Sequence, residues 1–443
     1  MTLYIVRHQE SFANANEIIS GKYYDFPLTL TGIKNSYNLA EKIYDIPGYK
    51  KLVLSSPFIR AKQTAEIIAE KLSIPIIIDP SIHEVDPGII QGPKSKGIYP
   101  KYSDVWEQRG DLDKIPKAEK GNEIQARTIY FLERYLNPRD SEIIVSHAGF
   151  NKSLVNTVLG NNRTDFLDVS YDKIHILDDI WNRIEYEKLI LANSSETYFV
   201  KTKEDYYVLK KSSGINIDQL RLQKEISDFA GVEFMPRVFY HGIKEDYAVQ
   251  VLNYFKGMHK YGSINKREEL IYSVYLFSER IKNFPEKLEN FFENVITSLV
   301  NSIEDSYLKR YGRILVDNER FRNITNQNKQ VLVHYDLHRS NIIFTNEGIR
   351  FLDLGAFMSA PEQFQPASFF MASLLLEELK DFNLEKTLSS WPKKNLSREE
   401  IIIFMKARAL MGCAFFHSLK NKSSNEEDIH ERYLKSMSIL DNI

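Results

Sequence analysis

The sequence predicts two successive domains, an α/β domain followed by an α+β domain. In the first part of the chain, apolar strand-like runs at residues 3–6, 52–54 and 143–145 alternate with amphipathic helical segments. Between residues 189 and 252 several short strand signals recur close together, as in a small antiparallel sheet. Farther on, to about residue 322, the apolar spacing becomes helical.

Composition sets broad limits on the protein. A length of 443 residues suggests two or three domains, and 43% hydrophobic with 27% charged residues is ordinary for a globular protein. The 58 basic and 60 acidic side chains nearly cancel, so net charge gives no support for a nucleic-acid or membrane-surface partner.

The cysteine count and the N-terminal residues argue against a disulfide-bonded, a secreted and a membrane-spanning protein. Cys413 is the only cysteine, so neither an internal disulfide nor a cysteine metal cluster is expected, and its apolar neighbours predict a buried thiol. The first apolar run is too short for a signal peptide, and no segment has the length of a membrane span. We therefore expect a cytoplasmic protein.

Charged and imidazole side chains follow the predicted strands of the first domain. Arg7 and His8 follow the first strand, and Arg60 begins the helix after the second. Glu84 lies in a glycine-containing loop, and His147 follows the strand at 143–145. Because open α/β sheets bind ligands at strand ends, these side chains predict a phosphate pocket.

The chemistry of this set fits a covalent phosphohistidine route. Neutral His8 would attack phosphorus, while Arg7, Arg60 and a protonated His147 would neutralise the phosphoryl oxygens. Glu84 would protonate the leaving oxygen and later take a proton from the hydrolytic water. No metal is required, because the cationic side chains supply the positive charge.

These residues make the first part resemble the histidine phosphatase superfamily, which includes the phosphoglycerate mutases. The resemblance covers about residues 1–160 and implies a phosphoglycerate mutase-like, three-layer fold acting on a small-molecule phosphate ester without a cofactor. It assigns His8 as nucleophile and Glu84 as acid, with Arg7, Arg60, His147 and Asn14 binding phosphate and Ser11 nearby.

Two features of the first domain leave its details open. Gln9 stands where the family usually has glycine, so we expect a reshaped loop beside His8. Residues 93–122, rich in lysine and tyrosine and containing Trp106, could form a lid over the substrate or a solvated loop with an aromatic anchor.

The boundary between the domains is predicted near Asp179. A last strand at 173–177 would close the first sheet, which gives a first domain of residues 1–179 and a second of residues 180–443. The second divides into an N-lobe, 180–252, and a C-lobe, 253–443. Because no proline-rich or glycine-rich linker is present, the domains are expected to pack closely.

The stretch 331–355 carries the chemistry of the second domain. Its three short predicted strands present Asp336, Asn341 and Asp353 with the spacing HxDxxxxN, followed twelve residues later by DLG. Phosphoryl transfer needs a carboxylate to orient an attacking hydroxyl, and an amide oxygen with a second carboxylate to hold magnesium. We therefore interpret Asp336 as catalytic and the other two as metal ligands.

This stretch resembles the aminoglycoside phosphotransferase and choline kinase group of the bilobal, protein-kinase-like fold, over the last three fifths of the chain. The resemblance implies ATP and Mg²⁺ as cofactors and a small-molecule hydroxyl acceptor. It matches Lys210 to the phosphate-contacting lysine, with Glu225 as its ion-pair partner, and places adenine at the backbone of Val251 and Asn253. Lys211, on the opposite face of the strand, is the weaker candidate.

The second domain also departs from its group at two positions. Tyr335 replaces a glycine of the catalytic loop, and Ser368 stands where many relatives have aspartate. The aromatic region from Phe364 onward could form the acceptor pocket or simply a core, so no acceptor residue is assigned.

The leading hypothesis is a bifunctional enzyme, a phosphoric monoester hydrolase joined to an ATP-dependent phosphotransferase with an alcohol group as acceptor. The two activities could oppose each other on one sugar-like metabolite or serve successive steps on different compounds. Alternatively, one domain senses phosphate and regulates the other, which Gln9, Tyr335 and Ser368 would favour. Oligomeric state, the acceptor and the choice of ATP over GTP are not encoded in any recognisable pattern.

Overall fold

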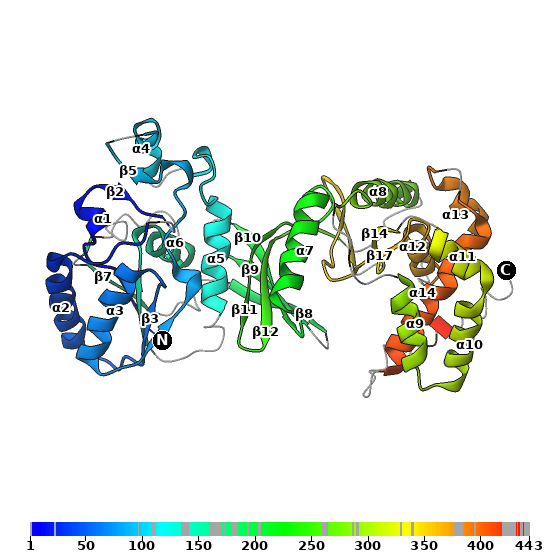
Figure 1. The fold of residues 1–443 in the computed structure, drawn as a ribbon, viewed down its shortest axis with the longest axis horizontal. Helices are drawn as coiled ribbons and strands as arrows, with labels where there is room; N and C mark the ends of the chain where they lie inside the picture. The colour runs from blue at the N-terminus through cyan, green and yellow to red at the C-terminus, as the bar shows by residue number, and fades with distance from the viewer. Residues whose placement is uncertain are drawn as a thin grey trace. The chain divides into compact units, whose positions relative to one another are not determined.

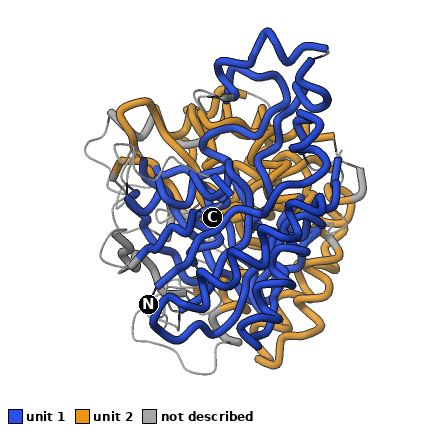
Figure 2. Tube along the Cα trace, turned by 90° about the vertical axis from the view of Figure 1, so that its left-hand side faces the viewer, with its two compact units in different colours: residues 1–221, 238–254 blue, residues 222–237, 255–443 orange. Residues whose placement is uncertain are grey.

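The protein is described by a computed structural model that forms two compact units. Figure 2 colours them: the first comprises Met1–Arg221 and Val238–Tyr254, and the second Leu222–Arg237 and Phe255–Ile443. The predicted domain boundary near Asp179 stays a prediction. The described residues are 2–21, 24–95, 97–107, 112–133, 141–159, 170–171, 173–178, 185–192, 195–202, 205–258, 265–285, 288, 292–327, 330–337, 341–375, 384–393, 396–418, 431, 433–434 and 437.

A five-stranded sheet in the order β4-β3-β6-β1-β7 forms the centre of the first unit. Strands β4, β3, β6 and β1 pair in parallel, and β7 closes the edge antiparallel to β1, so the predicted strand at 173–177 is confirmed. The bounds are β1 Thr2–Arg7, β3 Val53–Ser55, β4 Ile76–Ile78, β6 Glu142–Ser146 and β7 Ile174–Asp178.

Helices cover both faces of this sheet (Figure 1). Tyr4 and Val6 point to a cluster shared with α2 (Leu30–Asp45) and α3 (Ile59–Leu72). Leu3 and Ile5 point to the opposite cluster, shared with α5 (Gly121–Glu133) and α6 (Ala148–Leu159). Because alternate side chains of a strand face opposite sides, both faces are apolar and both need a helical layer. The predicted three-layer α/β fold is confirmed.

The segment predicted as a lid or a solvated loop packs against its own small core. It contains β5 (Gly92–Pro93), α4 (Tyr99–Glu107) and the 3₁₀ turn η3 (Leu112–Lys114), and it follows η1 (Pro80–Ile82) and η2 (Gly88–Ile90). Trp106 is buried in a cluster with Ile19 of β2 (Ile18–Ile19) and Val85. The aromatic residue is therefore a packed anchor, and the segment is more than a solvated loop.

A second sheet of the first unit is antiparallel, as predicted, in the order β11-β12-β10-β9-β8. Its strands are β8 Glu185–Ala192, β9 Ser195–Lys201, β10 Tyr206–Ser213, β11 Val238–Lys244 and β12 Tyr247–Asn253. Tyr207, Leu209 and Val251 belong to the same hydrophobic cluster as Leu3 and Phe131. The two sheets thus share one core, with α5 between them (Figure 1).

The second unit is mainly helical and contains short paired strands that carry the motif at 331–355. Strand β14 (Gln330–His334) pairs with β17 (Phe357–Pro361), and β15 (Ile342–Thr345) with β16 (Gly348–Phe351) and β13 (Gly257–Met258). The helices are α7 Ile217–Ala230, which begins in the first unit, α8 Asn265–Ile281, α9 Phe292–Ser302, α10 Ser306–Asp317, α11 Glu319–Gln327, α12 Phe364–Leu375, α13 Leu384–Ser390 and α14 Arg398–Ser418.

Aromatic packing explains the apolar region that begins at Phe364. Its ring lies 4.4 Å from that of Phe292 and 5.9 Å from that of Phe404, centroid to centroid, and all three side chains are buried. Cys413 is free and buried, as predicted. These residues form a core that joins α9, α12 and α14.

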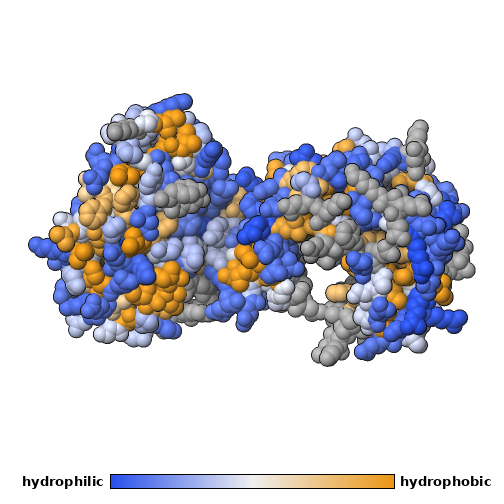
Figure 3. Space-filling view, viewed as in Figure 1, coloured by the Kyte–Doolittle hydropathy of each residue, from blue (hydrophilic) through white to orange (hydrophobic). Residues whose placement is uncertain are grey.

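No described helix is both long enough and apolar enough to span a bilayer. On the face drawn in Figure 3, apolar side chains lie in separate groups between polar ones. Isolated apolar groups of this kind are normal on protein surfaces.

Candidate functional site

The first site forms where parallel strands end. β1 and β6 pair with Arg7 opposite Ser146, so the residues that follow, His8 and His147, are neighbours. Their ring centroids are 5.0 Å apart, and both rings are buried. Strand β3 leads into Ser56, whose Oγ lies 2.8 Å from His147 Nε2. The residues that follow β1, β3 and β6 therefore lie close together, as expected for strands that end at one edge of a sheet.

Hydrogen bonds fix the tautomer of His8. Its Nδ1 lies 2.8 Å from the carbonyl oxygen of Gln9, which can only accept, so Nδ1 carries the proton. Arg60 Nε donates to His8 Nε2 at 3.2 Å, which places the nitrogen lone pair in the pocket. Burial, followed by the charges of Arg60 and Arg7, lowers the pKa of His8 well below its usual 6.5. A neutral imidazole with its lone pair at Nε2 is what nucleophilic attack requires, and in this structure that lone pair accepts the hydrogen bond from Arg60.

Two arginines bring positive charge to His8. Arg60, 1% exposed, is held through Nη1 by Asp25 Oδ1 at 3.3 Å. The guanidinium of Arg7 lies 4.4 Å from the ring centroid of Tyr171, a cation–π contact. Burial lowers the pKa of Arg60 and nearby Glu84 and Asp25 raise it, but an arginine stays charged in either case.

The surroundings of His147 lower its pKa when no phosphate is bound. Burial, followed by the charges of Arg60 and the other neighbouring bases, lowers its pKa well below 6.5, which favours neutral imidazole. Its Nδ1 is buried without a hydrogen-bond partner among the described residues. The expected protonated form therefore needs the negative charge of a bound phosphate to raise the pKa.

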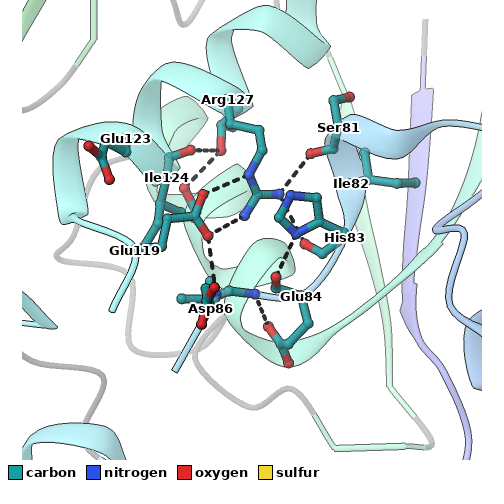
Figure 4. Close-up of polar contacts among 12 residues, drawn as sticks. Ser81, Ile82, His83, Glu84, Asp86, Glu119, Glu123, Ile124 and Arg127 are labelled. Carbon is teal, nitrogen blue, oxygen red and sulfur yellow. Dashed lines mark hydrogen bonds and ion pairs between the residues drawn. The ribbon is translucent and has the colours of Figure 1, made fainter. Parts of the chain in front are cut away.

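The candidate acid Glu84 is held by backbone groups (Figure 4). Its Oε1 accepts from Val85 N at 2.8 Å and from Gly149 N at 3.1 Å. A Cβ at position 149 would lie 2.5 Å from that oxygen and 2.6 Å from Val85, so only glycine fits there. The second residue of α6, the helix that follows His147, thus also orients the acid.

A buried arginine shapes the loop before Glu84 (Figure 4). Arg127 of α5 binds Glu119 through Nε at 2.8 Å and Nη2 at 2.9 Å, and its Nη1 donates to the carbonyls of Ser81 at 2.7 Å and His83 at 2.9 Å. Glu119 also accepts from Asp86 N at 3.3 Å. Arg127 was not singled out from the sequence, because the carbonyls that it binds lie more than forty residues away and leave no local signal.

The residues after His8 have mixed roles. Ser11 caps α1 (Phe12–Ala15), and Asn14 Oδ1 accepts from Ser11 N at 3.0 Å and Oγ at 2.7 Å, so only the amide NH₂ of Asn14 could serve a phosphate. Gln9 Nε2 donates to the carbonyl of Tyr171 at 2.6 Å. Gln9 thus ties the loop beside His8 to the residue that covers Arg7, and the reshaping of this loop stays a prediction. Sequence reasoning missed Tyr171.

The second constellation lies in the catalytic-type loop of the second unit. Asn341 Nδ2 donates to the carbonyl of Asp336 at 2.9 Å and approaches its Oδ2 at 3.4 Å. His334 Nε2 donates to the carbonyl of Asp353 at 3.0 Å, and its Nδ1 accepts from Asp336 N at 3.3 Å. One neutral histidine therefore connects the segments that carry the three predicted residues.

A buried arginine from α14 completes this loop. Arg408 Nη2 contacts Asp336 Oδ1 at 2.5 Å, and its Nε donates to the carbonyl of Tyr335 at 2.8 Å. Asp336 and Tyr433 raise the pKa of Arg408 against the lowering effect of burial. Arg408 follows Asp336 by 72 residues, and no pattern in the sequence indicated the pair.

The two departures in this loop contact each other. Ser368 Oγ donates to the carbonyl of Tyr335 at 2.5 Å, and Tyr335 N donates to the carbonyl of Ala356 at 2.9 Å. Tyr335 and Ser368 thus stabilise the loop conformation, and neither displaces Asp336.

The predicted nucleotide residues are divided between the units. Lys210 lies on β10 and Val251 and Asn253 on β12 of the first unit, and Glu225 lies on α7 in the second. Their roles, including the ion pair of Lys210 with Glu225, stay predictions. Among the described residues, no group of three or more acidic, histidine or cysteine side chains forms a ready metal site.

Comparison with known proteins identifies the first part of the chain. A family profile described as the histidine phosphatase superfamily (branch 1) matches residues 3–183. A probable phosphoglycerate mutase GpmB of Erwinia tasmaniensis is 30% identical over 166 residues, which are 36% of this chain and 75% of that protein. The corresponding Yersinia pestis protein is 29% identical over the same shares.

Solved structures resemble both parts. The α-ribazole phosphatase from Shigella flexneri is 22% identical with a TM-score of 0.34, covering 40% of this chain and 90% of that one. A thermostable mutant of the aminoglycoside phosphotransferase APH(4)-Ia is 12% identical with a TM-score of 0.47, covering 59% and 96%. The choline kinase LicA from Streptococcus pneumoniae is 15% identical with a TM-score of 0.43, covering 58% and 93%.

Proposed function

The chain belongs to the histidine phosphatase superfamily, and from this premise we propose that its first part hydrolyses a small-molecule phosphate ester through a phosphohistidine at His8. The observation that carries the proposal is the tautomer of His8, with its proton held at Nδ1 and its Nε2 lone pair beside Arg60.

The reaction would run in two displacements. His8 Nε2 attacks phosphorus and the ester P–O bond breaks, while Glu84 gives its proton to the departing alkoxide. Water then attacks the phosphohistidine, Glu84 takes its proton, and the P–N bond breaks to release phosphate. Arg7, Arg60 and His147 neutralise charge on the phosphoryl oxygens in both steps. These residues supply the charge without a cofactor.

For the second part we propose an ATP-dependent phosphotransferase that acts on a hydroxyl group of a small molecule. Asp336 would accept a hydrogen bond from that hydroxyl through the carboxylate that Arg408 orients. Asn341 and Asp353 would hold Mg²⁺, which neutralises charge on the nucleotide phosphates when bound. An amide oxygen and one carboxylate fit Mg²⁺, which commonly takes few protein ligands and completes its shell with water and phosphate oxygens.

Lys210, Glu225 and the backbone of Val251 and Asn253 are the proposed ATP contacts. The observation supporting this assignment is the loop geometry of the second unit, in which His334 ties the segments of Asp336 and Asp353 together. The combined proposal is a kinase and a phosphatase acting in opposition on one sugar-like metabolite. Separate substrates in successive steps, or a sensing role for one part, are the alternatives.

Separated-function variants test these proposals. His8→Ala leaves only the kinase and Asp336→Asn only the phosphatase. Each is incubated with a small-molecule cell extract, ATP and Mg²⁺, and mass spectrometry identifies compounds that gain or lose a phosphoryl group. A compound made by the first variant and consumed by the second supports the opposed pair, whereas two lists without overlap support separate steps. If one variant changes no compound, catalysis by the part that this variant retains is contradicted, and a sensing role for that part is favoured.

A further inference from the structure

Helix α5 contacts both the acid loop of the first site and the second sheet. Arg127 binds the carbonyls before Glu84, and Glu133, at the end of the helix, binds the sheet that carries Lys210. We propose that Glu133 is a positioning residue for nucleotide binding, supplied to the kinase by the histidine phosphatase part. The proposal rests on the proposed kinase function of the second part.

Glu133 collects donors from three neighbouring strands. Its carboxylate is 2% exposed and lies 2.6 Å from Lys211 Nζ of β10 and 3.3 Å from Lys244 Nζ of β11. The hydroxyl of Tyr247, on β12, donates to it at 3.1 Å. A buried carboxylate between two ammonium groups is compensated only while all of them keep their places, so Glu133 holds the three strands in register on α5.

Other residues of α5 contact the same face of the second sheet. Tyr130 packs edge-on against Tyr240, with centroids 5.0 Å apart, and its hydroxyl donates to the carbonyl of Ile243 at 3.2 Å. A Cβ at Gly242 would lie 2.6 Å from that hydroxyl, so the helix approaches the strand as closely as glycine allows. Gln125 accepts a hydrogen bond from Tyr207. The second sheet of the first unit therefore packs closely on α5, and α5 lies within residues 3–183, which match the family profile.

The side chains of β10 alternate between the face of the sheet that packs on α5 and the opposite face, where the nucleotide is proposed to bind. Tyr207 and Leu209 face the shared core, and Lys211 faces Glu133, so Lys210 points to the opposite side. Its cross-strand neighbour there is Gln250, which is 2% exposed and whose Nε2 has no hydrogen-bond partner among the described residues. The side of the sheet that carries Lys210 thus has a polar group available to a ligand.

Anchoring Lys211 fixes the adjacent Lys210. Strand β10 cannot rotate or slide without breaking the ion pair of Lys211, because successive residues share one backbone. Loss of the Glu133 charge would leave the ammonium groups of Lys211 and Lys244, on two strands of the same sheet, without their shared counter-ion. Their repulsion would displace β10, and Lys210 would meet the nucleotide phosphates less often.

Calorimetric titration of the full chain with Mg-ATP tests the proposal. In Glu133→Gln, the Kd for Mg-ATP is expected to rise about tenfold, the size typical of coupling between linked sites. Lys211→Met should weaken binding less, because Lys244 keeps its partner. The phosphatase kcat/KM on p-nitrophenyl phosphate should stay within about twofold, because Glu133 contacts none of the proposed residues of the first site.

Glu41→Gln is the matched control, since it breaks the exposed ion pair with Lys71 in the same unit. It should leave the Kd unchanged. A Glu133→Gln protein that is less heat-stable but binds Mg-ATP like the wild type would show a purely structural role and overturn the proposal. If wild-type protein does not bind Mg-ATP, the kinase assignment itself fails, and the positioning role fails with it. If Glu133→Gln does not fold, Lys211→Met decides, and an unchanged Kd in that variant overturns the proposal.

Discussion

The two candidate sites handle phosphate with opposite charge. In the first, His8, His147 and Arg60 are buried, and arginines lie next to the nucleophile, with the carboxylates of Glu84 and Asp25 farther out. In the second, Asp336, Asn341 and Asp353 are only half-buried, and two of the three are carboxylates. A dianionic ester can enter the first site directly, whereas the second must receive a cation with its nucleotide. The difference predicts a metal-independent reaction beside a metal-dependent one.

The largest expected difference between the two sites is the effect of a metal chelator on their reaction rates. With excess EDTA, phosphoryl transfer from ATP should fall to background, because Asn341 and Asp353 then hold no cation. Hydrolysis of p-nitrophenyl phosphate by the same preparation should be unchanged, because arginines supply the charge in the first site. Both rates are measured before and after Mg²⁺ is restored. A phosphatase that also stops, and recovers with the metal, would contradict the comparison.

Removal of the nucleophile comes next. His8→Ala should lower phosphatase kcat by about 10³-fold or more, the loss typical of removing a nucleophile. Rapid acid-quenched reactions with labelled substrate should show a phosphoenzyme in the wild type and none in the variant. Kinase activity of the variant serves as its folding control. Retention of the labelled phosphoenzyme in the variant would place the nucleophile elsewhere.

The buried Arg127 network should matter for stability as well as activity. Arg127→Met leaves Glu119 and the carbonyls of Ser81 and His83 without their donor, and breaking a buried pair costs about 3–5 kcal/mol in the free energy of unfolding. Urea unfolding measures this change. The double variant with Glu119→Leu should recover part of it, because the unpaired carboxylate is gone. A loss below about 1 kcal/mol would show that solvent replaces the arginine.

A smaller effect is expected from Arg408, which touches Asp336 but none of the other predicted kinase residues. Arg408→Met should lower kcat of phosphoryl transfer about tenfold, with little change in KM for ATP, because the carboxylate loses its orientation. Steady-state ATP consumption with the acceptor measures both constants. Arg398→Met is the control on the same helix, since Arg398 pairs with Glu385 at a more exposed position. An effect confined to KM would contradict an orienting role.

The smallest effect concerns pH. Because burial and Arg60 lower the pKa of His8 below 6.5, the imidazole stays unprotonated as the solution is acidified past that value. Phosphatase kcat/KM should fall less than about twofold from pH 7.5 to 6.0, where a histidine with an unshifted pKa would cause about a fourfold loss. A pH–rate profile with p-nitrophenyl phosphate measures this. A midpoint at or above pH 6.5 would contradict the expected shift.

The same lowered pKa sets the sign of a stability change. Between the folded pKa and 6.5, the unfolded chain binds more protons at His8 and His147 than the folded chain does, so stability decreases as pH falls through that window. Urea unfolding of wild type and His8→Gln at pH 7.5 and 6.0 separates the contribution of His8.

Sequence reasoning could bring together the proposed reacting groups of the first site because several of them follow strands. An apolar run predicts a strand. Because β1 and β6 pair in parallel, the residues that follow them, His8 and His147, lie at the same edge of the sheet. The spacing of Asp336, Asn341 and Asp353 is likewise local, since Asn341 follows Asp336 by five residues and the hairpin of β15 and β16 connects Asn341 to Asp353. The lowered pKa of His147 has no signal in the sequence, because burial and neighbouring charges set it.

The sequence by itself determined the fold class, the order of the two sheets along the chain and the side chains able to do chemistry, because each depends on residues close together in the chain. Only the tertiary structure decided which partners orient them. Arg127 meets Glu119, Arg408 meets Asp336, and Glu133 meets Lys211. With 58 basic and 60 acidic side chains available, charge alone cannot choose a partner, and packing of distant segments into a dry interior makes the choice.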